Sequence, residues 1–130
     1  MKIRYLAVVS GLLLFASSAE AQRPDVPAMY HGTWQVIEKL GDVPSCSAAD
    51  ADIRMTVSAT EISLPGGYCR LDGIMPGGDD PLQLQAYCEP EDSEHVVIEE
   101  WRVTNAGQRQ YLTVKSLHPG YPYEHQYGRC

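Results

Sequence analysis

The stretch PLQLQAYC, residues 81–88, decides the class of fold because its apolar and polar side chains alternate. In an extended chain one face would carry four of these side chains, those of Leu82, Leu84, Ala86 and Cys88. The other face would carry Gln83, Gln85 and Tyr87. Successive side chains of a strand point to opposite faces, so this period of two predicts an antiparallel strand that covers a core with one face.

The same period recurs on both sides of this stretch. The segments that show it are ADIRMTVS (51–58), YCRLDGIM (68–75), EHVVIEEWRV (94–103) and RQYLTVKSL (109–117). The inward faces of the first two would be formed by Ile53, Met55 and Val57 and by Cys69, Leu71 and Met75. The adjacent Val96 and Val97 leave the register of the third open. Short strands between Gly- and Pro-rich turns, without a helical pattern, predict an all-β sandwich or barrel.

The first 21 residues have the pattern of a secretory signal peptide. Lys2 and Arg4 precede an apolar run from Leu6 to Ala16, and Ala19–Ala21 fits the cleavage pattern of small residues. An uncleaved membrane anchor is the alternative, but the apolar run is short for a bilayer. We therefore expect cleavage after Ala21 and a periplasmic or secreted protein.

The exported part has the size of one domain. We expect an extended, Pro-rich segment over residues 22–29 and a barrel domain over residues 30–130. Without Lys2, Arg4 and Glu20, the formal net charge changes from −7 to about −8. An acidic surface repels nucleic acid and anionic membranes, so we expect neither as a partner, and we expect a monomer.

All four cysteines lie in the exported part, at Cys46, Cys69, Cys88 and Cys130. In an oxidising compartment an even number of cysteines predicts two disulfides. We favour Cys46–Cys69 with Cys88–Cys130, which would attach a loop to a strand and the C terminus to the barrel. The alternative joins Cys69 to Cys88 and Cys46 to Cys130, because Cys69 and Cys88 lie symmetrically about the turn PGGDDP (76–81).

Metal sites have little support in the sequence. The paired ligand spacing of a structural zinc site is absent, and a group formed by His118, His125 and Cys130 is the remaining zinc alternative. The acidic loops around GGDD and PEDSE contain ligands suited to calcium but lack the spacing of an EF-hand. We expect no metal and no cofactor.

The barrel domain begins with YHGTWQVIEK, residues 30–39. Its Gly32-Thr33-Trp34 resembles the G-x-W motif on the first strand of the calycins, which include lipocalins and avidins. This resemblance implies a small antiparallel up-and-down barrel of about six to eight strands. In calycins a basic residue near the end of the barrel packs across the motif's tryptophan. The resemblance therefore implies that Arg129 lies over Trp34. We also expect the C-terminal segment to fold back under the barrel and Cys130 to bond to a strand cysteine.

Two narrower resemblances concern function. The chain is similar to small periplasmic proteins with a G-x-W start, four cysteines and an Arg-Cys end. It also resembles the periplasmic inhibitors of serralysin-type metalloproteases in the order Trp34, Cys46, Cys69, Trp101. In those inhibitors the segment before the barrel enters the protease cleft, which implies contacts from Gln22, Arg23, Pro24 and Asp25. That family has a single disulfide, and a terminal Gln22 can cyclise and lose its amine, so this chain departs from the family.

The sequence contains little that is typical of an enzyme. No nucleophile-elbow motif surrounds a serine, and the adjacent Glu99 and Glu100 would point to opposite faces of a strand. We therefore expect a non-catalytic barrel that binds another protein, with protease inhibition as one candidate. The alternatives are a barrel that binds a small ligand and an envelope protein with a structural role.

The barrel interior separates these alternatives. We expect the inward side chains to fill it, and the candidates are Leu71, Met75, Leu82, Leu84 and Leu112. We expect the C-terminal tyrosines to cover one end of the barrel, and these are Tyr121, Tyr123 and Tyr127. An open apolar cavity would instead favour a small ligand.

Overall fold

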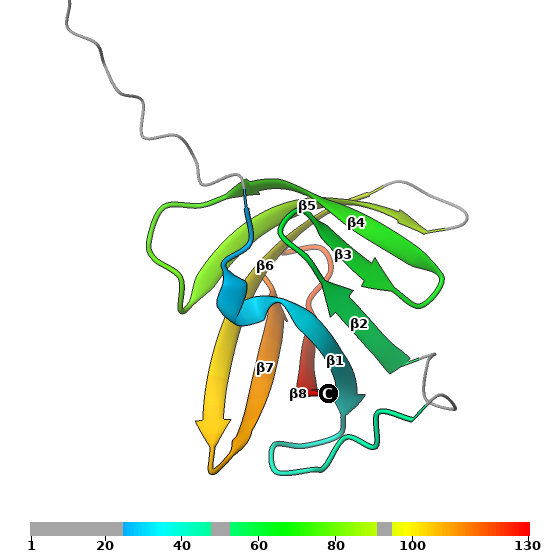
Figure 1. The fold of residues 1–130 in the computed structure, drawn as a ribbon. Coiled ribbons are helices and arrows are strands. Elements are labelled where there is room, and N and C mark those ends of the chain that lie inside the picture. The colour runs from blue at the N-terminus through cyan, green and yellow to red at the C-terminus, as the bar shows by residue number, and fades with distance from the viewer. Residues whose placement is uncertain (1–24, 48–52, 91–94) are drawn as a thin grey trace, which may run out of the picture.

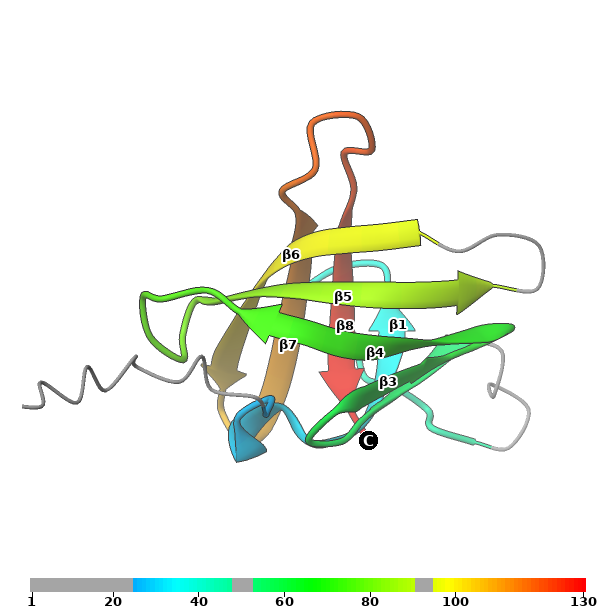
Figure 2. The same ribbon diagram turned by 90° about the horizontal axis from the view of Figure 1, so that it is seen from above.

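The computed structural model describes residues 25–47, 53–90 and 95–130, which form a closed barrel of eight antiparallel strands (Figures 1 and 2). The strands are β1 (Gly32–Ile37), β2 (Arg54–Val57), β3 (Glu61–Leu64), β4 (Gly67–Ile74), β5 (Leu82–Pro90), β6 (His95–Ala106), β7 (Arg109–Ser116) and β8 (Glu124–Arg129). A short 3-10 helix, η1 (Ala28–Tyr30), precedes them. Each strand pairs with the next and β8 pairs with β1, which confirms the all-β up-and-down barrel.

Strand β5 has the alternation that its sequence predicts. Leu82, Leu84 and Ala86 are completely buried and Cys88 is nearly so. The intervening side chains of β5 are half-buried. An up-and-down barrel has one interior face, so a period of two in the sequence becomes a period of two in burial.

Strand β4 breaks its expected alternation. The register with β5 shifts between Leu71 and Gly73, so Asp72 is an extra residue in the ladder. A β-bulge reverses which side chains face inward beyond it. Ile74 therefore belongs to the buried core and Met75, which we expected to face inward, does not. Ile53 was also expected inside, but it lies before β2 and is exposed.

The segment before β1 is packed against the barrel. Val26 is 1% exposed, and its backbone N–H donates a hydrogen bond to the carbonyl of Ala59. Tyr30 at the end of η1 is completely buried. The backbone is extended at Pro27, with φ −56° and ψ 145°, and η1 begins at Ala28, so the prediction of an extended segment over 22–29 is wrong only for Ala28 and Met29. Residues 1–24, which include the expected signal peptide, lie outside the described residues.

The disulfides are Cys46–Cys130 and Cys69–Cys88, so the favoured pairing is wrong and the alternative is correct. Cys69 and Cys88 are direct partners in the β4–β5 ladder. The backbone N–H of Cys46 donates to Oε1 of Gln35 on β1 at 2.7 Å. This contact brings the β1–β2 loop beside the end of β8 and thus to Cys130. Because Cys130 is in a disulfide, it is no ligand for the suggested zinc group.

The C terminus does not fold back under the barrel. Strand β8 runs to Arg129 in register with β1, and the backbone N–H of Cys130 donates to the carbonyl of Thr33 at 2.9 Å. Cys130 bonds to a loop cysteine rather than to the strand cysteine we expected. The end of the chain is therefore the strand that closes the barrel.

Arg129 makes the contact with Trp34 that the calycin resemblance implies. Its guanidinium carbon lies 4.1 Å from the centre of the indole ring. Its nitrogens also donate to the carbonyls of His31 at 2.6 Å and Met29 at 2.5 Å, and to Oε1 of Gln110 at 2.7 Å. One side chain thus connects β8, β7, η1 and the residue that follows η1.

The glycine of the G-x-W motif has a structural reason. Gly32 has a φ of +117°, a backbone conformation that residues with a side chain rarely adopt. A Cβ atom at this position would lie 3.1 Å from Nη1 of Arg129. Glycine therefore allows both the turn into β1 and the close approach of the guanidinium.

We predict that Arg129→Lys lowers the free energy of unfolding by about 2 kcal/mol, because lysine loses the planar stacking and most of the donors. Chemical denaturation followed by tryptophan fluorescence measures this change. Arg109→Lys, at an exposed position of the β6–β7 hairpin, is the control and should leave stability unchanged. An unchanged denaturation midpoint in Arg129→Lys would show that the guanidinium does not hold this end of the barrel.

The two disulfides should differ in their contributions to stability. Cys46–Cys130 spans 84 residues and Cys69–Cys88 spans 19. A longer closed loop removes more conformational entropy from the unfolded chain, so loss of the first should cost about 1 kcal/mol more than loss of the second. Denaturation of the two paired Cys→Ser variants tests this order, and peptide mapping of the oxidised protein tests the pairing.

Candidate functional site

The interior of the barrel is filled at one end and hollow at the other. The filled end consists of fully buried large side chains, which are Tyr30, Trp34, Leu82, Leu84, Trp101 and Leu112. Beyond them lies a cavity of about 1040 Å³, and none of these six residues lines it. The expectation that inward side chains fill the whole interior is therefore wrong. Side chains fill the interior only at the end that η1, Trp34 and Trp101 close.

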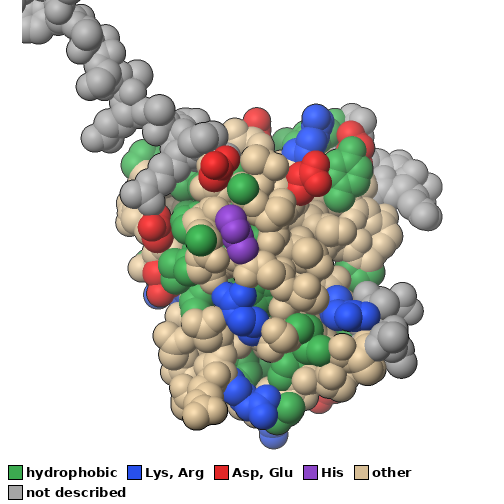
Figure 3. Space-filling model, in the orientation of Figure 1, with side chains coloured by type: hydrophobic (Ala, Val, Ile, Leu, Met, Phe, Trp, Pro, Cys, Tyr) green, Lys and Arg blue, Asp and Glu red, His purple; other side chains and the backbone are tan. Residues whose placement is uncertain are grey.

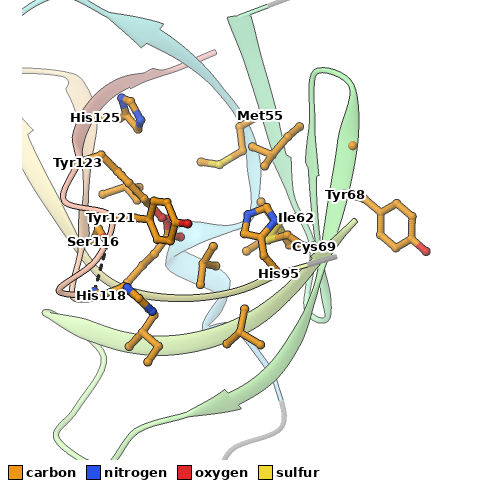
Figure 4. A pocket seen from close by; sticks show the side chains of 18 of the residues that line it. Met55, Ile62, Tyr68, Cys69, His95, Ser116, His118, Tyr121, Tyr123 and His125 are labelled. Carbon is orange, nitrogen blue, oxygen red and sulfur yellow. Dashed lines mark hydrogen bonds between the residues drawn. A yellow bond between two sulfur atoms is a disulfide. The ribbon is translucent and has the colours of Figure 1, made fainter. Parts of the chain in front are cut away.

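The cavity has an apolar wall and an aromatic wall (Figure 4). The apolar wall contains Met55, Ile62, Leu64, Val97, Val114 and the Cys69–Cys88 disulfide. On the other side, the labelled side chains of His118, Tyr121, Tyr123 and His125 lie together. They come from β8 and from the segment between β7 and β8, which extends beyond the neighbouring strands in Figure 2. Tyr68 points away from the cavity in Figure 4, and its hydroxyl donates to Glu89 at 2.7 Å.

Glu99 places a carboxylate inside this cavity. It lies on β6, two residues before the buried Trp101, and therefore on the inward face of that strand. Nε1 of Trp101 donates to Oε1 of Glu99 at 3.2 Å, and the hydroxyl of Tyr123 donates to Oε2. Trp101 belongs to the filled end of the barrel. Its indole N–H therefore holds the Glu99 carboxylate where the packed core meets the cavity.

The neighbouring Glu100 faces the outside, as expected for successive residues of a strand. Its Oε1 accepts a hydrogen bond from Nε of Arg102 at 2.9 Å. Sequence reasoning excluded a pair of carboxylates here but did not place Glu99 inside. The adjacent Val96 and Val97 left open which face of this strand points inward, so the orientation of Glu99 was not predicted. Had Trp101 been taken as an inward residue, Glu99, two positions earlier, would have been expected to point inward as well.

The environment of Glu99 disfavours its charge. Burial raises the pKa of Glu99 above its ordinary value, although the hydrogen bonds from Tyr123 and Trp101 and the nearby His125 act in the opposite direction. Burial, with the nearby Glu99 carboxylate, also raises the pKa of Tyr127 to about 12 and raises that of Tyr123. Among the described residues that line the cavity there is no lysine or arginine. The carboxylate thus lies in the cavity without a strong cationic partner.

The C-terminal tyrosines do not form a single cover. Tyr127 is 7% exposed and belongs to the core, and Tyr123 is bonded to Glu99 inside the cavity. Tyr121 is 74% exposed at the mouth. The prediction that these tyrosines cover one end of the barrel is therefore wrong for Tyr123 and Tyr127, which lie inside it. Tyr127 lies on β8 and Tyr123 directly precedes it, and both line the cavity.

Of the residues expected to contact a partner protein, the structure describes only Asp25, which is exposed. Gln22, Arg23 and Pro24 lie outside the described residues. Within the described ranges, no three potential metal ligands gather into a group. Acidic, basic and polar side chains share the face seen in Figure 3, and neither charge covers it continuously.

No protein-family model, curated protein or solved structure matches this chain. Among the described residues no helix is long and apolar enough to cross a membrane.

We predict that Glu99→Gln gains stability relative to the wild type as the pH rises from about 5 to about 8. The folded protein holds the proton of Glu99 more tightly than the unfolded chain, so ionisation of this group destabilises the fold as the pH increases through its raised pKa. Urea denaturation of both proteins at each pH gives the difference in the free energy of unfolding.

The control for this measurement is Glu100→Gln. Arg102 lowers the pKa of Glu100, so that carboxyl group is ionised in both the folded and unfolded states above about pH 5. Its difference from the wild type should be constant over the range. A constant difference for Glu99→Gln as well would contradict the burial of the Glu99 carboxylate.

Proposed function

We propose that this protein binds a small amphiphilic molecule in the barrel cavity, without catalysis. The observation that carries the proposal is the hollow end of the barrel, with about 1040 Å³ of open volume beside a filled core. Small-molecule sites have volumes of roughly 300–1,000 Å³ and combine an apolar lining with a few placed polar groups. Glu99 and Tyr123 supply those polar groups against the wall of Met55 and Ile62.

The cavity is supported by rigid surroundings. The Cys69–Cys88 disulfide joins β4 to β5 in its wall. The Trp101 side chain below it is completely buried and bonded to Glu99. A site that is formed before the ligand arrives loses less conformational entropy on binding, which favours affinity.

The calycin resemblance supports the same function, as an analogy of fold. Protein binding, with protease inhibition as one form, stays a prediction, since it depends on Gln22–Asp25. Because Val26 is buried, that segment is shorter than the sequence suggested. The two disulfides fit an oxidising compartment outside the cytoplasm, and we propose that the protein is periplasmic or secreted.

The test is the binding of a neutral amphiphilic fluorophore, N-phenyl-1-naphthylamine, to the oxidised protein. We expect saturable binding to one site, and we expect Val97→Trp to weaken it at least about tenfold because the indole occupies the cavity. Val97 is half-buried in the lining, so the larger side chain extends into open space rather than into the packed core.

Val43→Trp is the matched control. Val43 is 64% exposed on the β1–β2 loop and does not line the cavity, so this variant should bind the fluorophore like the wild type. Failure of the wild type to bind, or equal binding by Val97→Trp, would refute the cavity as a ligand site. The protein-binding and structural alternatives would then remain.

A further inference from the structure

We infer that the cavity selects cationic amphiphiles, with an ammonium group beside the Glu99 carboxylate and an apolar tail along the wall that contains Met55, Ile62 and Leu64. This inference rests on the proposed function, because it names the chemical class of ligand for the same cavity. It depends on four observations, which concern charge, the hydrogen-bond acceptor positions of Glu99, aromatic rings and the position of the apolar wall.

The cavity is lined by a carboxylate and by three histidines, which are His95, His118 and His125. Glu99 is the carboxylate that points into it from β6, and no lysine or arginine is found among the described lining residues. Within the described part of the chain, no basic side chain forms an ion pair with Glu99. His125 favours the charged form of Glu99 from nearby but makes no ion pair with it, so a bound ammonium would supply a closer partner for this partly buried carboxylate.

Glu99 retains the capacity to accept more hydrogen bonds. An ionised carboxylate has about four acceptor positions on its two oxygens. Trp101 donates to Oε1 and Tyr123 donates to Oε2, so each oxygen has one protein donor. These two bonds fix the orientation of the carboxylate and leave acceptor positions for an ammonium N–H. A quaternary ammonium has no N–H and would be held by the charge of the carboxylate and by the aromatic rings.

Aromatic rings line the side of the cavity from which Tyr123 reaches the Glu99 carboxylate. The ring of Tyr123 stacks on that of His125 with centres 5.2 Å apart and planes inclined by 24°. At the mouth, Tyr121 lies against His118 with ring centres 5.5 Å apart. Figure 4 shows these four side chains together on one side of the cavity. Faces of aromatic rings attract ammonium groups, and they do so more strongly where water is excluded.

The remaining wall suits the tail of such a ligand. Met55, Ile62 and Leu64 come from β2 and β3 and lie across the cavity from the rings, where Figure 4 labels Met55 and Ile62. The whole chain has a formal net charge of −7, which attracts cations and repels fatty acid anions over longer distances. Charge therefore favours the same class of ligand both at the site and during its approach.

The test compares three probes with the same ten-carbon tail: decyltrimethylammonium, decanol and decanoate. Each displaces N-phenyl-1-naphthylamine from the oxidised protein near neutral pH, below its critical micelle concentration. We expect decyltrimethylammonium to bind at least about tenfold more tightly than decanol, and decanoate to bind most weakly. Equal affinities for the ammonium and the alcohol, or tighter binding of decanoate, would overturn the inference.

Two isosteric variants assign the preference to one carboxylate. Glu99→Gln should reduce the affinity for decyltrimethylammonium to that for decanol, while Glu100→Gln on the outer face should retain the full preference. An unchanged preference in Glu99→Gln would also overturn the inference. Should that variant fail to fold, the ranking of the three probes on the wild type still decides.

The two proposals fail in different ways. If N-phenyl-1-naphthylamine does not bind the wild type, the cavity is not a ligand site and both proposals fall. If it binds and the three probes displace it equally, the cavity binds apolar molecules without regard to charge, and only this inference falls.

Discussion

The pairing of β8 with β1, fixed by the Arg129 guanidinium over Trp34, is the contact on which the rest of the structure depends. Without it, eight strands would form an open sheet with two unpaired edges. The same guanidinium donates to the carbonyls of Met29 and His31, so the end of the chain holds the segment before β1 against the closed end. The side chain of Arg129 thus links the last strand of the barrel to the segment that precedes the first strand.

Closure also divides the interior into a core and a cavity. Tyr30 packs edge-on against Trp101, with ring centres 5.6 Å apart, and both side chains are fully buried. The opposite side of Trp101 provides the indole N–H that binds Glu99. One tryptophan is therefore part of the hydrophobic core and part of the polar end of the cavity, so the stability of the closed end and the geometry of the site depend on each other.

The two disulfides act on different parts of the barrel. Cys69–Cys88 links paired residues of β4 and β5 in the cavity wall. Cys46–Cys130 attaches the β1–β2 loop to the end of β8, where Pro44 contacts Gly128 so closely that a Cβ atom there would lie 2.8 Å from it. The loop buries Gln35 on the outer side of β1, and Oε1 of Gln35 accepts the N–H of Cys46. The second disulfide therefore protects the seam at which the barrel closes.

Alternation, a local pattern, was sufficient to predict the all-β class and the inward face of β5, and the resemblance carried by the G-x-W motif implied the contact of Arg129 with Trp34. The disulfide pairing, the inward orientation of Glu99 and the cavity above Trp101 required the arrangement of the strands in space. Each of these depends on register between strands, and a single extra residue such as Asp72 reverses the face of everything beyond it. Inward side chains fill a barrel only if they reach across its width. That width is set by how the strands close into a barrel, and composition does not reveal it.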